Sequence, residues 1–427
     1  MYNNMRPFLL LLLVAVGCNN NPQTKKLTPI ENAVAADTAV VIHPPALKNV
    51  TDTFSTAAFP IGLAPHLISL SSGDSFYLQI PAGYKIAVAA QLNTRLRFLA
   101  KSPDGRLFAT DMHDRSDNRR GRVLILENWN DSSKSFEKVT TFLSNLHNPN
   151  QVAFYKNYIY VAETDRLRRF KYEAGQPAPT DTGTLVASFP NHGLNYKYGG
   201  WHLTRSLAFK NDKLYVSVGS SCNACVETEI VRASIVEMNP DGTDAKTFAT
   251  GLRNTVGLKW IGNQLWGTGM GRDLIGPDKP EDVFQQIDSG GYYGWPYYFQ
   301  YQQKIYADET FKDSARAAGI KEPSKAFLGF KAHSAPLGFD YFKNFDDASL
   351  NNSVLVCLHG STSVRRQRGN AIVRVEANNE YTEIVTGFLS GKTEADRHGR
   401  PCDVLMHSTS SFFFTDDFKG VLYYVWK

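Results

Sequence analysis

Residues 209–219 read FKNDKLYVSVG, a polar turn around Asn211 and Asp212 followed by an alternating apolar strand. The apolar residues SLAF precede the turn, so this stretch predicts a β-hairpin. The same order of strand, turn and strand recurs in five further stretches: SPDGRLFATDM (102–112), FYKNYIYVAET (154–164), WIGNQLWGTGM (260–270), LNNSVLVCLHG (350–360) and HSTSSFFFTDD (407–417). The repeat, rather than any single hairpin, decides the fold.

The spacing of the six hairpins is about 50 residues, with one longer gap of about 90 between the fourth and the fifth, which is typical of propeller blades. The sequence therefore predicts an all-β fold, a six-bladed β-propeller over residues 76–427. The long gap predicts an insertion near 275–345 on one face. Long amphipathic helical patterns, which would favour an α/β fold, are absent from the sequence.

The composition is that of a globular protein with a large core: 427 residues, 42% hydrophobic and 12% aromatic. The net charge of +5 is spread along the chain, and only Arg365–Arg368 form a basic cluster. Because no basic stripe interleaved with aromatic residues accompanies this cluster, the sequence argues against a nucleic-acid partner.

The N-terminus predicts export. Arg6 precedes the apolar run FLLLLLVAV, which ends in small residues before Cys18 and resembles a bacterial lipoprotein signal. We expect a signal peptide over 1–17, a lipid anchor on Cys18, and a flexible tether with lead-in over 18–75. The protein would then be attached to a bacterial membrane, in the periplasm or on the cell surface. A plain secretory signal with an incidental cysteine is the alternative.

Further motifs lie beside the predicted hairpins, where the loops of a propeller meet at one mouth. In chain order they are GLRNTVGLKW (251–260), GMGRDLIGPDKPEDVFQQI (269–287), GGYYGWPYYF (290–299), APLGFDYF (335–342), LHGS (358–361) and GRPCDVLM (399–406). From about residue 80 to the end, this series resembles the glucose/sorbosone dehydrogenase family, propellers that use pyrroloquinoline quinone. Within this family, the sequence looks closer to the sorbosone and aldose dehydrogenase branch as a whole than to any individual enzyme.

The resemblance implies a cofactor with three carboxylates, which arginine binds through paired, charge-assisted hydrogen bonds. Arg97, Arg253 and Arg400 match the family's motif positions, and Arg205 is a fourth candidate. Asn254 would hydrogen-bond a quinone oxygen. Taken singly, each arginine is better explained by a salt bridge at the surface or at a strand end, and only several of them at one mouth favour an anionic ligand.

The resemblance also implies a Ca²⁺ ion held by backbone carbonyls at Gly271 and Arg272, with oxygen ligands that suit this hard cation. Asp273 lies next to them, where a simple turn role is the alternative. The family's general base is a histidine before an inner strand, with an arginine shortly after it. In GGWHLTRSLAF (199–209) this matches His202, whose imidazole suits proton abstraction near pH 7.

The LHGS motif predicts that His359 lines the same pocket, with core packing as the alternative. The family often continues with Trp-Asn-Arg, but this chain has Thr362, Ser363 and Val364. We therefore expect Arg365 to replace the missing arginine through a shift of the loop.

The resulting hypothesis is a quinoprotein dehydrogenase that oxidises a sugar, polyol or aldehyde by hydride transfer and passes electrons to a quinone or cytochrome. No dinucleotide-binding fingerprint is present that would favour NAD. Two alternatives remain: a non-catalytic propeller that binds glycan or protein, and a calcium-dependent lactonase-type propeller. A lactonase would favour carboxylates around the metal, whereas these motifs supply mostly arginine.

The cysteines predict disulfides in an oxidising compartment. Cys222 and Cys225 form a CNAC motif, which suits a tight disulfide or half of a metal site. Cys357 and Cys402 each lie two residues from a predicted pocket residue and would share its facing, so we expect them to form a second bridge. Two buried free thiols are the alternative.

Overall fold

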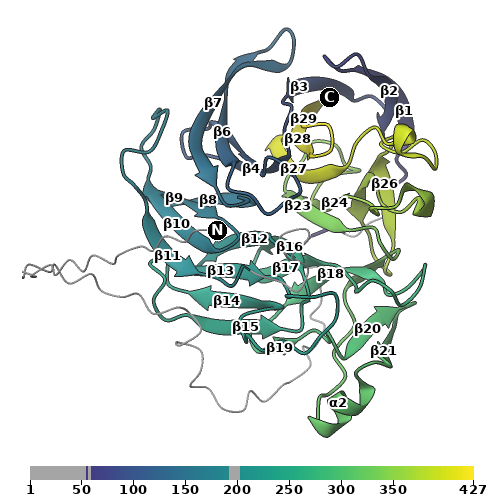
Figure 1. Ribbon diagram of the computed structural model, residues 1–427. Coiled ribbons are helices and arrows are strands. Elements are labelled where there is room, and N and C mark those ends of the chain that lie inside the picture. Colours follow the sequence, from purple (N-terminus) through teal and green to yellow (C-terminus); the bar gives the residue numbers. More distant parts are fainter. Residues whose placement is uncertain (1–53, 56–58, 192–201) are drawn as a thin grey trace, which may run out of the picture.

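The computed structural model describes residues 54–55, 59–191 and 202–427, whose regular secondary structure is almost entirely β-strand (Figure 1). The predicted signal peptide, Cys18 and the first part of the predicted tether lie outside the described residues, so those predictions stay predictions. Within the described ranges, no helix is both long enough and apolar enough to cross a membrane.

The first three blades are antiparallel sheets whose strands follow one another along the chain. Blade 1 contains β4 (Leu96–Lys101), β5 (Leu107–Asp111), β6 (Gly121–Asn130) and β7 (Ser135–Leu146). Blade 2 contains β8 (Gln151–Tyr155), β9 (Tyr158–Ala162), β10 (Arg166–Lys171) and β11 (Thr184–Ser188). Blade 3 contains β12 (Arg205–Lys210), β13 (Lys213–Val218), β14 (Ser234–Met238) and β15 (Lys246–Thr250).

The remaining three blades follow the same plan, apart from one strand that comes from the start of the described chain. Blade 4 contains β16 (Thr255–Ile261), β17 (Gln264–Gly269), β18 (Asp282–Ile287) and β22 (Leu328–Phe330). Blade 5 contains β23 (Pro336–Phe342), β24 (Ser353–Leu358), β25 (Ala371–Val375) and β26 (Tyr381–Val385). Blade 6 contains β27 (Pro401–Ser408), β28 (Ser411–Asp416), β29 (Val421–Trp426) and β3 (Lys85–Gln91).

The first strands of the six blades contact one another in a closed order, β4–β8–β12–β16–β23–β27 and back to β4. Each repeated stretch of the sequence supplies the turn and second strand of the first hairpin in its blade. The predicted six-bladed propeller is thus confirmed. The ring closes between the two ends of the described chain, because β3 pairs with β29 from Lys85–Trp426 to Gln91–Val421.

Hydroxyl groups join neighbouring blades close to the axis. Thr268 Oγ1 donates to the carbonyl of Leu337 at 2.8 Å, and Thr415 Oγ1 donates to the carbonyl of Arg97 at 2.6 Å. Thr110 makes the same kind of bond between blades 1 and 2. Because these bonds are buried and paired, they fix how far each first strand is staggered against the next. The beginnings of the first strands therefore have set relative positions.

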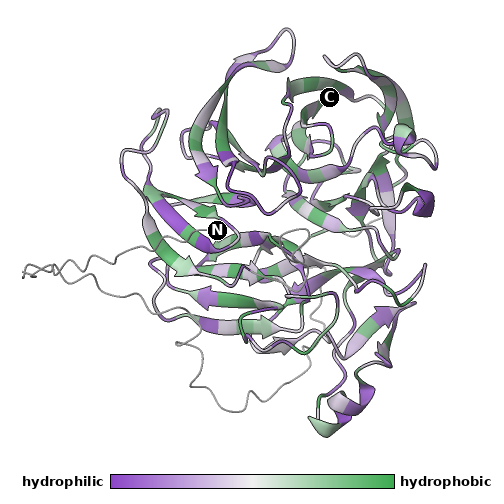
Figure 2. Cartoon of the chain, viewed as in Figure 1, coloured by the Kyte–Doolittle hydropathy of each residue, from purple (hydrophilic) through white to green (hydrophobic). Residues whose placement is uncertain are grey.

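Apolar side chains fill the spaces between blades, and Figure 2 shows hydrophobic residues concentrated along the strands and polar ones at many turns. Trp266 of β17 is fully buried and stacks on Phe284 of β18 with 4.8 Å between ring centroids. Removing such an aromatic side chain costs about 3–5 kcal/mol in folding free energy. Gly257 permits a close approach of blades 4 and 5, since a Cβ there would lie 2.3 Å from the carbonyl oxygen of Leu337.

The predicted tether is too long. β1 (Leu63–Ser69) and β2 (Ser75–Pro81) form a hairpin, and Gln79 bridges Thr386 just beyond β26. Ile68, Leu78 and Ile80 are buried in the same cluster as residues of blades 5 and 6. The part of the predicted tether from residue 63 onward therefore belongs to the folded body. The sequence prediction missed it because LAPHLIS carries a proline and a histidine between its apolar residues.

The predicted insertion at 275–345 is too wide. β18 and β22 complete blade 4 inside that range, so the added segment is only 288–327. It contains β19 (Gly291–Tyr292), which pairs in parallel with β15, the hairpin of β20 (Tyr298–Tyr301) and β21 (Lys304–Ala307), and helix α2 (Lys312–Ala317). In Figure 1, β20, β21 and α2 project from the ring beside blade 4.

One of the two predicted disulfides is present. Cys222 and Cys225 are bonded, which confirms that prediction, whereas Cys357 and Cys402 are free and buried, so the second bridge is wrong. A β-bulge between Pro401 and Asp403 changes the facing of Cys402. Cys402 packs towards the first strands with Phe98, while Cys357 lies in the cluster shared by blades 5 and 6.

Candidate active site

One end of the ring collects most of the predicted site residues. In an antiparallel hairpin, the beginning of the first strand lies beside the end of the second, as Thr255–Gly269 and Pro401–Asp416 do here. Residues just before a first strand and just after a second strand therefore meet at one mouth of the propeller. His202, Arg253, Asn254, His359 and Arg400 all occupy such positions, and Arg97 is the second residue of β4.

The Asp417 cluster consists of Asp417, Arg95, Arg97 and His359, which come from blades 1, 5 and 6. Asp417 accepts hydrogen bonds of 2.6 Å from Arg95 Nη2, Arg97 Nη1 and His359 Nε2. Its side chain is fully buried. Burial alone would raise the pKa of Asp417, but the charge of Arg95 and the bond from His359 hold it well below its ordinary range. The carboxylate is therefore already paired with both arginines around it.

His359 lies at the mouth as predicted, but its Nε2 is committed to Asp417. Burial, reinforced by the charge of Arg400, lowers the pKa of His359 to about 3. The imidazole is therefore neutral at pH 7, and its Nε2–H donates to the carboxylate. Arg97 also donates to Asn150 Oδ1 at 3.2 Å.

Arg400 is buried next to this cluster, but its guanidinium has no carboxylate within hydrogen-bond distance among the described residues. Its Nε donates to the carbonyl of His359 at 3.0 Å, and its Nη2 donates to the carbonyl of Gly360. Burial lowers the pKa of Arg400 to about 9, so the guanidinium remains charged at pH 7. A buried cation that meets only neutral acceptors favours an anionic partner.

The His202 cluster consists of His202, Ser220, Arg253 and Asn254, from blades 3 and 4. His202 Nδ1 lies 3.1 Å from the carbonyl oxygen of Ser220 and 2.9 Å from its hydroxyl oxygen. The Ser220 hydroxyl donates its own hydrogen to the carbonyl of Cys222 at 2.8 Å, so both Ser220 oxygens face Nδ1 as acceptors. Nδ1 therefore carries the ring proton, and Nε2 holds the basic lone pair.

Burial, together with the positive charge of Arg253, lowers the pKa of His202 well below its ordinary value. The imidazole is thus a neutral base at pH 7. His202 and Arg253 also have φ angles of 51° and 33°, in the left-handed region that residues with a Cβ rarely adopt. Such backbone strain concentrates at functional sites.

Gly219 brings the two sides of this cluster together. A Cβ at Gly219 would lie 2.5 Å from His202 Cβ and 2.9 Å from Asn254 Oδ1, so only glycine leaves room for both. Asn254 donates from Nδ2 to the sulfur of Met270 at 3.7 Å, while its Oδ1 is buried and has no hydrogen-bond partner among the described residues. An unsatisfied buried amide next to the basic histidine points to a polar ligand.

Arg253 is buried and extends toward the loop after β17. Its Nε and Nη2 donate to the carbonyl and to Oδ1 of Asn223, at 2.9 and 3.0 Å, and its Nη1 donates to the carbonyl of Met270 at 3.3 Å. The nearest carboxylate, Asp273, is half-exposed and 3.9 Å away. Burial lowers the pKa of Arg253 to about 10. Like Arg400, this guanidinium is a charged group held by neutral acceptors.

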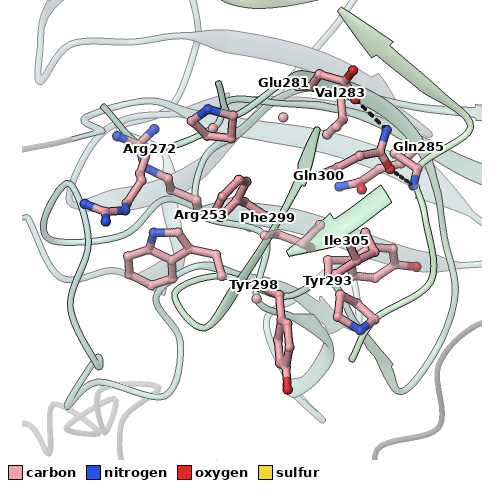
Figure 3. Close-up of a pocket in the computed structure, with 18 of the residues that line it drawn as sticks. Arg253, Arg272, Glu281, Val283, Gln285, Tyr293, Tyr298, Phe299, Gln300 and Ile305 are labelled. Carbon is pink, nitrogen blue, oxygen red and sulfur yellow. Dashed lines mark hydrogen bonds between the residues drawn. The ribbon is translucent and has the colours of Figure 1, made fainter. Parts of the chain in front are cut away.

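The predicted loop at Gly271 and Arg272 lies beside Arg253 and lines a cavity of about 80 Å³ that opens to solvent between blade 4 and segment 288–327 (Figure 3). The Gly271 amide donates to Asp282 at 2.9 Å, and Arg272 forms a double ion pair with Asp308. Within the described chain, neither the Gly271 nor the Arg272 carbonyl accepts a hydrogen bond, so both fit oxygen ligands for a cation such as Ca²⁺.

Arg205 is not a ligand contact in this arrangement. Its guanidinium is buried and donates to the backbone carbonyls of Pro190, His202 and Thr204 at 2.8–2.9 Å. It therefore fixes the backbone on which His202 sits. The position in the motif was right, but the sequence could not show that the side chain turns back under the preceding loop.

Arg365 is also not where the sequence analysis expected it. It lies in the short 3₁₀ helix η3 (Val364–Arg366) and is exposed. Arg397, which follows the 3₁₀ turn η4 (Glu394–Asp396), is buried instead and donates to the carbonyl of Thr362 at 3.1 Å. No shift of the loop carries Arg365 into the mouth.

The sequence analysis missed Asp417, Ser220 and Asn223, which orient the predicted residues. A signal for Asp417 existed, because the second strands of blades 1, 2 and 6 all end near an acidic residue: Asp111, Glu163 and Asp416–Asp417. Ser220 and Asn223 flank Cys222 in a segment that was considered only for its cysteines.

Residues 145–384 match the glucose/sorbosone dehydrogenase family. A curated Borreliella burgdorferi protein described as uncharacterized is 26% identical over 310 residues, which cover 68% of this chain and 78% of that protein. The holo form of the PQQ domain of Coprinopsis cinerea pyranose dehydrogenase superposes with a TM-score of 0.66 at 15% identity, covering 82% of this chain and 97% of that one. The calcium structure of a Trichoderma reesei carbohydrate-active enzyme of family AA12 gives 0.65 at 17% identity, covering 87% and 99%. At these identities the two solved structures support the fold alone.

Proposed function

The chain belongs to the glucose/sorbosone dehydrogenase family, and we propose that it is a quinoprotein dehydrogenase that oxidises a sugar, polyol or aldehyde. The observation that carries this proposal is the pair of buried guanidiniums, Arg253 and Arg400, whose hydrogen bonds go to neutral acceptors. Two buried cations at one mouth fit a ligand with several carboxylates, as pyrroloquinoline quinone has.

Each residue has a distinct role in the proposed reaction. Arg253 and Arg400 would bind cofactor carboxylates, Asn254 would hydrogen-bond a quinone oxygen, and the carbonyls of Gly271 and Arg272 would ligate Ca²⁺. When bound, pyrroloquinoline quinone supplies the group that accepts hydride. His202 accepts the substrate hydroxyl proton at Nε2, since Nδ1–H is held by Ser220.

The Asp417 cluster supports the site without joining the reaction. Arg97 Nη1 and His359 Nε2 are already hydrogen-bonded to the Asp417 carboxylate before any ligand arrives. We therefore assign Arg97 and His359 to the wall of the pocket. The electron acceptor would be a quinone or a cytochrome. Export, with a lipid anchor on Cys18, would attach the protein to a membrane, where it would meet its electron acceptor.

Reconstitution tests this proposal. Purified protein is titrated with pyrroloquinoline quinone in the presence of Ca²⁺, followed by absorbance, and a panel of sugars, polyols and aldehydes is then tested for dye reduction. We expect saturable cofactor binding, turnover with at least one substrate, and loss of both when a chelator removes Ca²⁺ before loading. The Arg365→Ala variant is the control, because this exposed arginine should leave binding unchanged. Absence of saturable binding in both proteins would contradict the proposal.

A further inference from the structure

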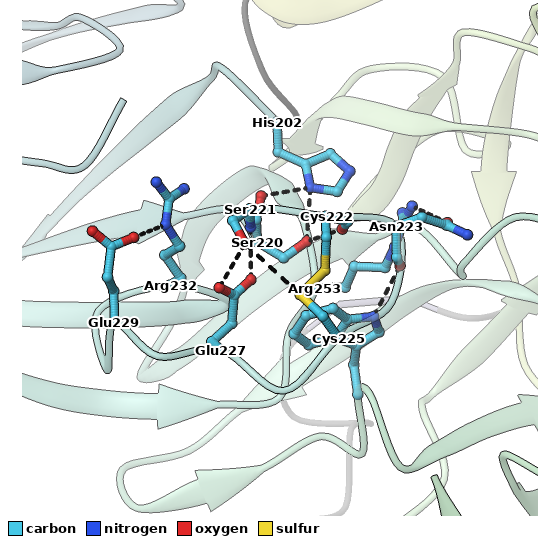
Figure 4. Close-up of a disulfide and its surroundings, with 11 residues drawn as sticks. His202, Ser220, Ser221, Cys222, Asn223, Cys225, Glu227, Glu229, Arg232 and Arg253 are labelled. Atoms are coloured by element: carbon cyan, nitrogen blue, oxygen red, sulfur yellow. Dashed lines mark hydrogen bonds and ion pairs between the residues drawn. A yellow bond between two sulfur atoms is a disulfide. The ribbon is translucent and has the colours of Figure 1, made fainter. Parts of the chain in front are cut away.

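The Cys222–Cys225 disulfide lies next to the His202 cluster (Figure 4). The segment leaves β13 after Val218 and passes Gly219 and Ser220 before the first cysteine. Cys222 and Cys225 pack against Ala233 and against Trp295 of segment 288–327. The disulfide thus closes a four-residue ring that is anchored on both sides of the mouth.

Asn223, inside this ring, makes a dense set of hydrogen bonds to the predicted ligand-binding residues. Arg253 donates to both the backbone carbonyl and Oδ1 of Asn223, at 2.9 and 3.0 Å. The amide of Asp273 donates to the same Oδ1 at 2.8 Å, and Asn223 Nδ2 donates to the carbonyl of Asp273 at 3.0 Å. Trp295 Nε1 also donates to the Asn223 carbonyl, at 3.2 Å.

We propose that Asn223 is a positioning residue that orients Arg253 and the Gly271–Asp273 loop together, and that the disulfide keeps Asn223 in place. The role of these two elements in cofactor binding rests on the proposed function, but their orientation by Asn223 does not. One side chain bonds the guanidinium and, at Asp273, both the amide and the carbonyl. A displacement of Asn223 therefore disturbs both elements at once.

The disulfide makes this arrangement sensitive to reduction. With a dithiol reductant, two electrons and two protons pass to the protein, the S–S bond breaks, both cysteines become thiols, and the reductant closes to its own disulfide. The ring then opens, and Asn223 is held only by hydrogen bonds. Because a mobile donor or acceptor orients its partner less well, Arg253 loses its fixed direction.

The first test needs no cofactor. Amide hydrogen exchange is measured by mass spectrometry on the peptide covering residues 270–276 in the wild type, in Asn223→Ala and in reduced wild type. Loss of the bond from the Asp273 amide to Asn223 Oδ1 should speed exchange of this peptide about 10-fold. Asn223→Asp keeps the acceptor for the Asp273 amide but loses the Nδ2 donor to the Asp273 carbonyl, so its exchange should lie between wild type and Asn223→Ala.

Asn239→Ala is the matched control. Asn239 is also half-buried and hydrogen-bonded through its side chain to Thr243 and Asp244, but it follows the far end of β14 in the same blade. It should leave the 270–276 peptide unchanged. If Asn223→Ala exchanges like Asn239→Ala, or if Asn223→Asp exchanges as fast as Asn223→Ala, the positioning role is wrong.

The second test measures the affinity for pyrroloquinoline quinone with Ca²⁺, in oxidised and reduced protein. We expect reduction to weaken binding about 10-fold, equivalent to one hydrogen bond to a charged group. A Cys222→Ala/Cys225→Ala variant should show the weakened affinity with or without reductant. Equal affinity of oxidised and reduced wild type would overturn the role of the disulfide. If the wild type binds no cofactor while the exchange results hold, the proposed function fails and the positioning role stands.

Discussion

The Asp417 cluster and the His202 cluster lie at the same end of the propeller and differ in how their charges are balanced. Asp417 is bonded to the buried Arg97 and His359 and to the half-buried Arg95, all at 2.6 Å. In the His202 cluster, Arg253 meets amide and carbonyl groups, and Asn254 Oδ1 has no partner in the described chain. In the first cluster both arginines already share a carboxylate partner, whereas the second has capacity for a ligand.

This difference separates two kinds of buried charge in one site. A buried charge that has a partner affects the free energy of unfolding mainly when that partner is removed, because the remaining charge is then buried alone. A buried charge without a carboxylate partner lowers stability in the empty protein, and a bound anion returns that free energy. Substitutions in the Asp417 cluster should therefore affect folding first, and substitutions in the His202 cluster should affect binding and turnover first.

His202→Ala should have the largest effect, and on turnover alone. Removing a general base lowers kcat about 10²–10⁴-fold, while cofactor affinity and the free energy of unfolding change little. Steady-state kinetics on the reconstituted enzyme measure the first, and urea unfolding the second. A variant that turns over at the wild-type rate would remove His202 from the mechanism.

Asp417→Asn should instead destabilise the fold. The substitution keeps the shape but leaves Arg95 and Arg97 buried without a counter-charge, which costs about 3–5 kcal/mol in free energy of unfolding. Asp74→Asn is the control, since Asp74 pairs with Lys419 at the surface and should leave stability unchanged. Equal stability of the two variants would refute the idea that the Asp417 cluster is a structural clamp.

Arg253→Ala and Arg400→Ala should weaken cofactor affinity by about 1–3 kcal/mol each, the worth of a hydrogen bond to a charged group.

Arg205→Ala tests the comparison from the other side. Because Arg205 bonds only backbone around His202, its loss should lower kcat more than affinity. Affinity losses as large as that of Arg400→Ala would return Arg205 to the cofactor contacts.

The pH dependence of kcat/KM should show the smallest effect. With the pKa of His202 held below its ordinary value by burial and by Arg253, the base remains neutral as the pH falls from 7.5 to 6. An ordinary imidazole would lose about three-quarters of its base form at pH 6. We therefore expect less than a twofold fall. Burial also raises the pKa of Asp282 to about 6 and that of Asp416 to about 7, and Asp282→Asn and Asp416→Asn separate these groups from His202.

The fold and the family were predictable because the evidence for them is local or ordered along the chain. Each blade is indicated in the sequence by one hairpin. The predicted number of six blades is confirmed, and so is the family. The closing strand β3 and the hairpin of β1 and β2 were not predicted as such, because their roles depend on partners at the opposite end of the described chain.

The site was predictable by position but not by partner. His202, Arg253, Asn254 and Arg400 lie where the motifs place them. Arg205 and Arg365 do not enter the mouth, because backbone turns decide where a long side chain points. Asp417 was missed for a related reason. Its role depends on contacts with Arg95 and Arg97, which lie at the start of the first blade, whereas Asp417 follows the second strand of the last blade.

The pairing of β3 with β29 also determines which blade is completed last during synthesis. A ribosome completes β3 before any blade, and it makes β29 last of all the described strands. Five blades draw on strands close together in sequence, so each is able to form during synthesis. The sixth stays incomplete, with an unpaired edge on β3, until Val421–Trp426 emerge. A chain that stops before Val421 would keep that edge exposed. The ring therefore closes only after the ribosome has made β29.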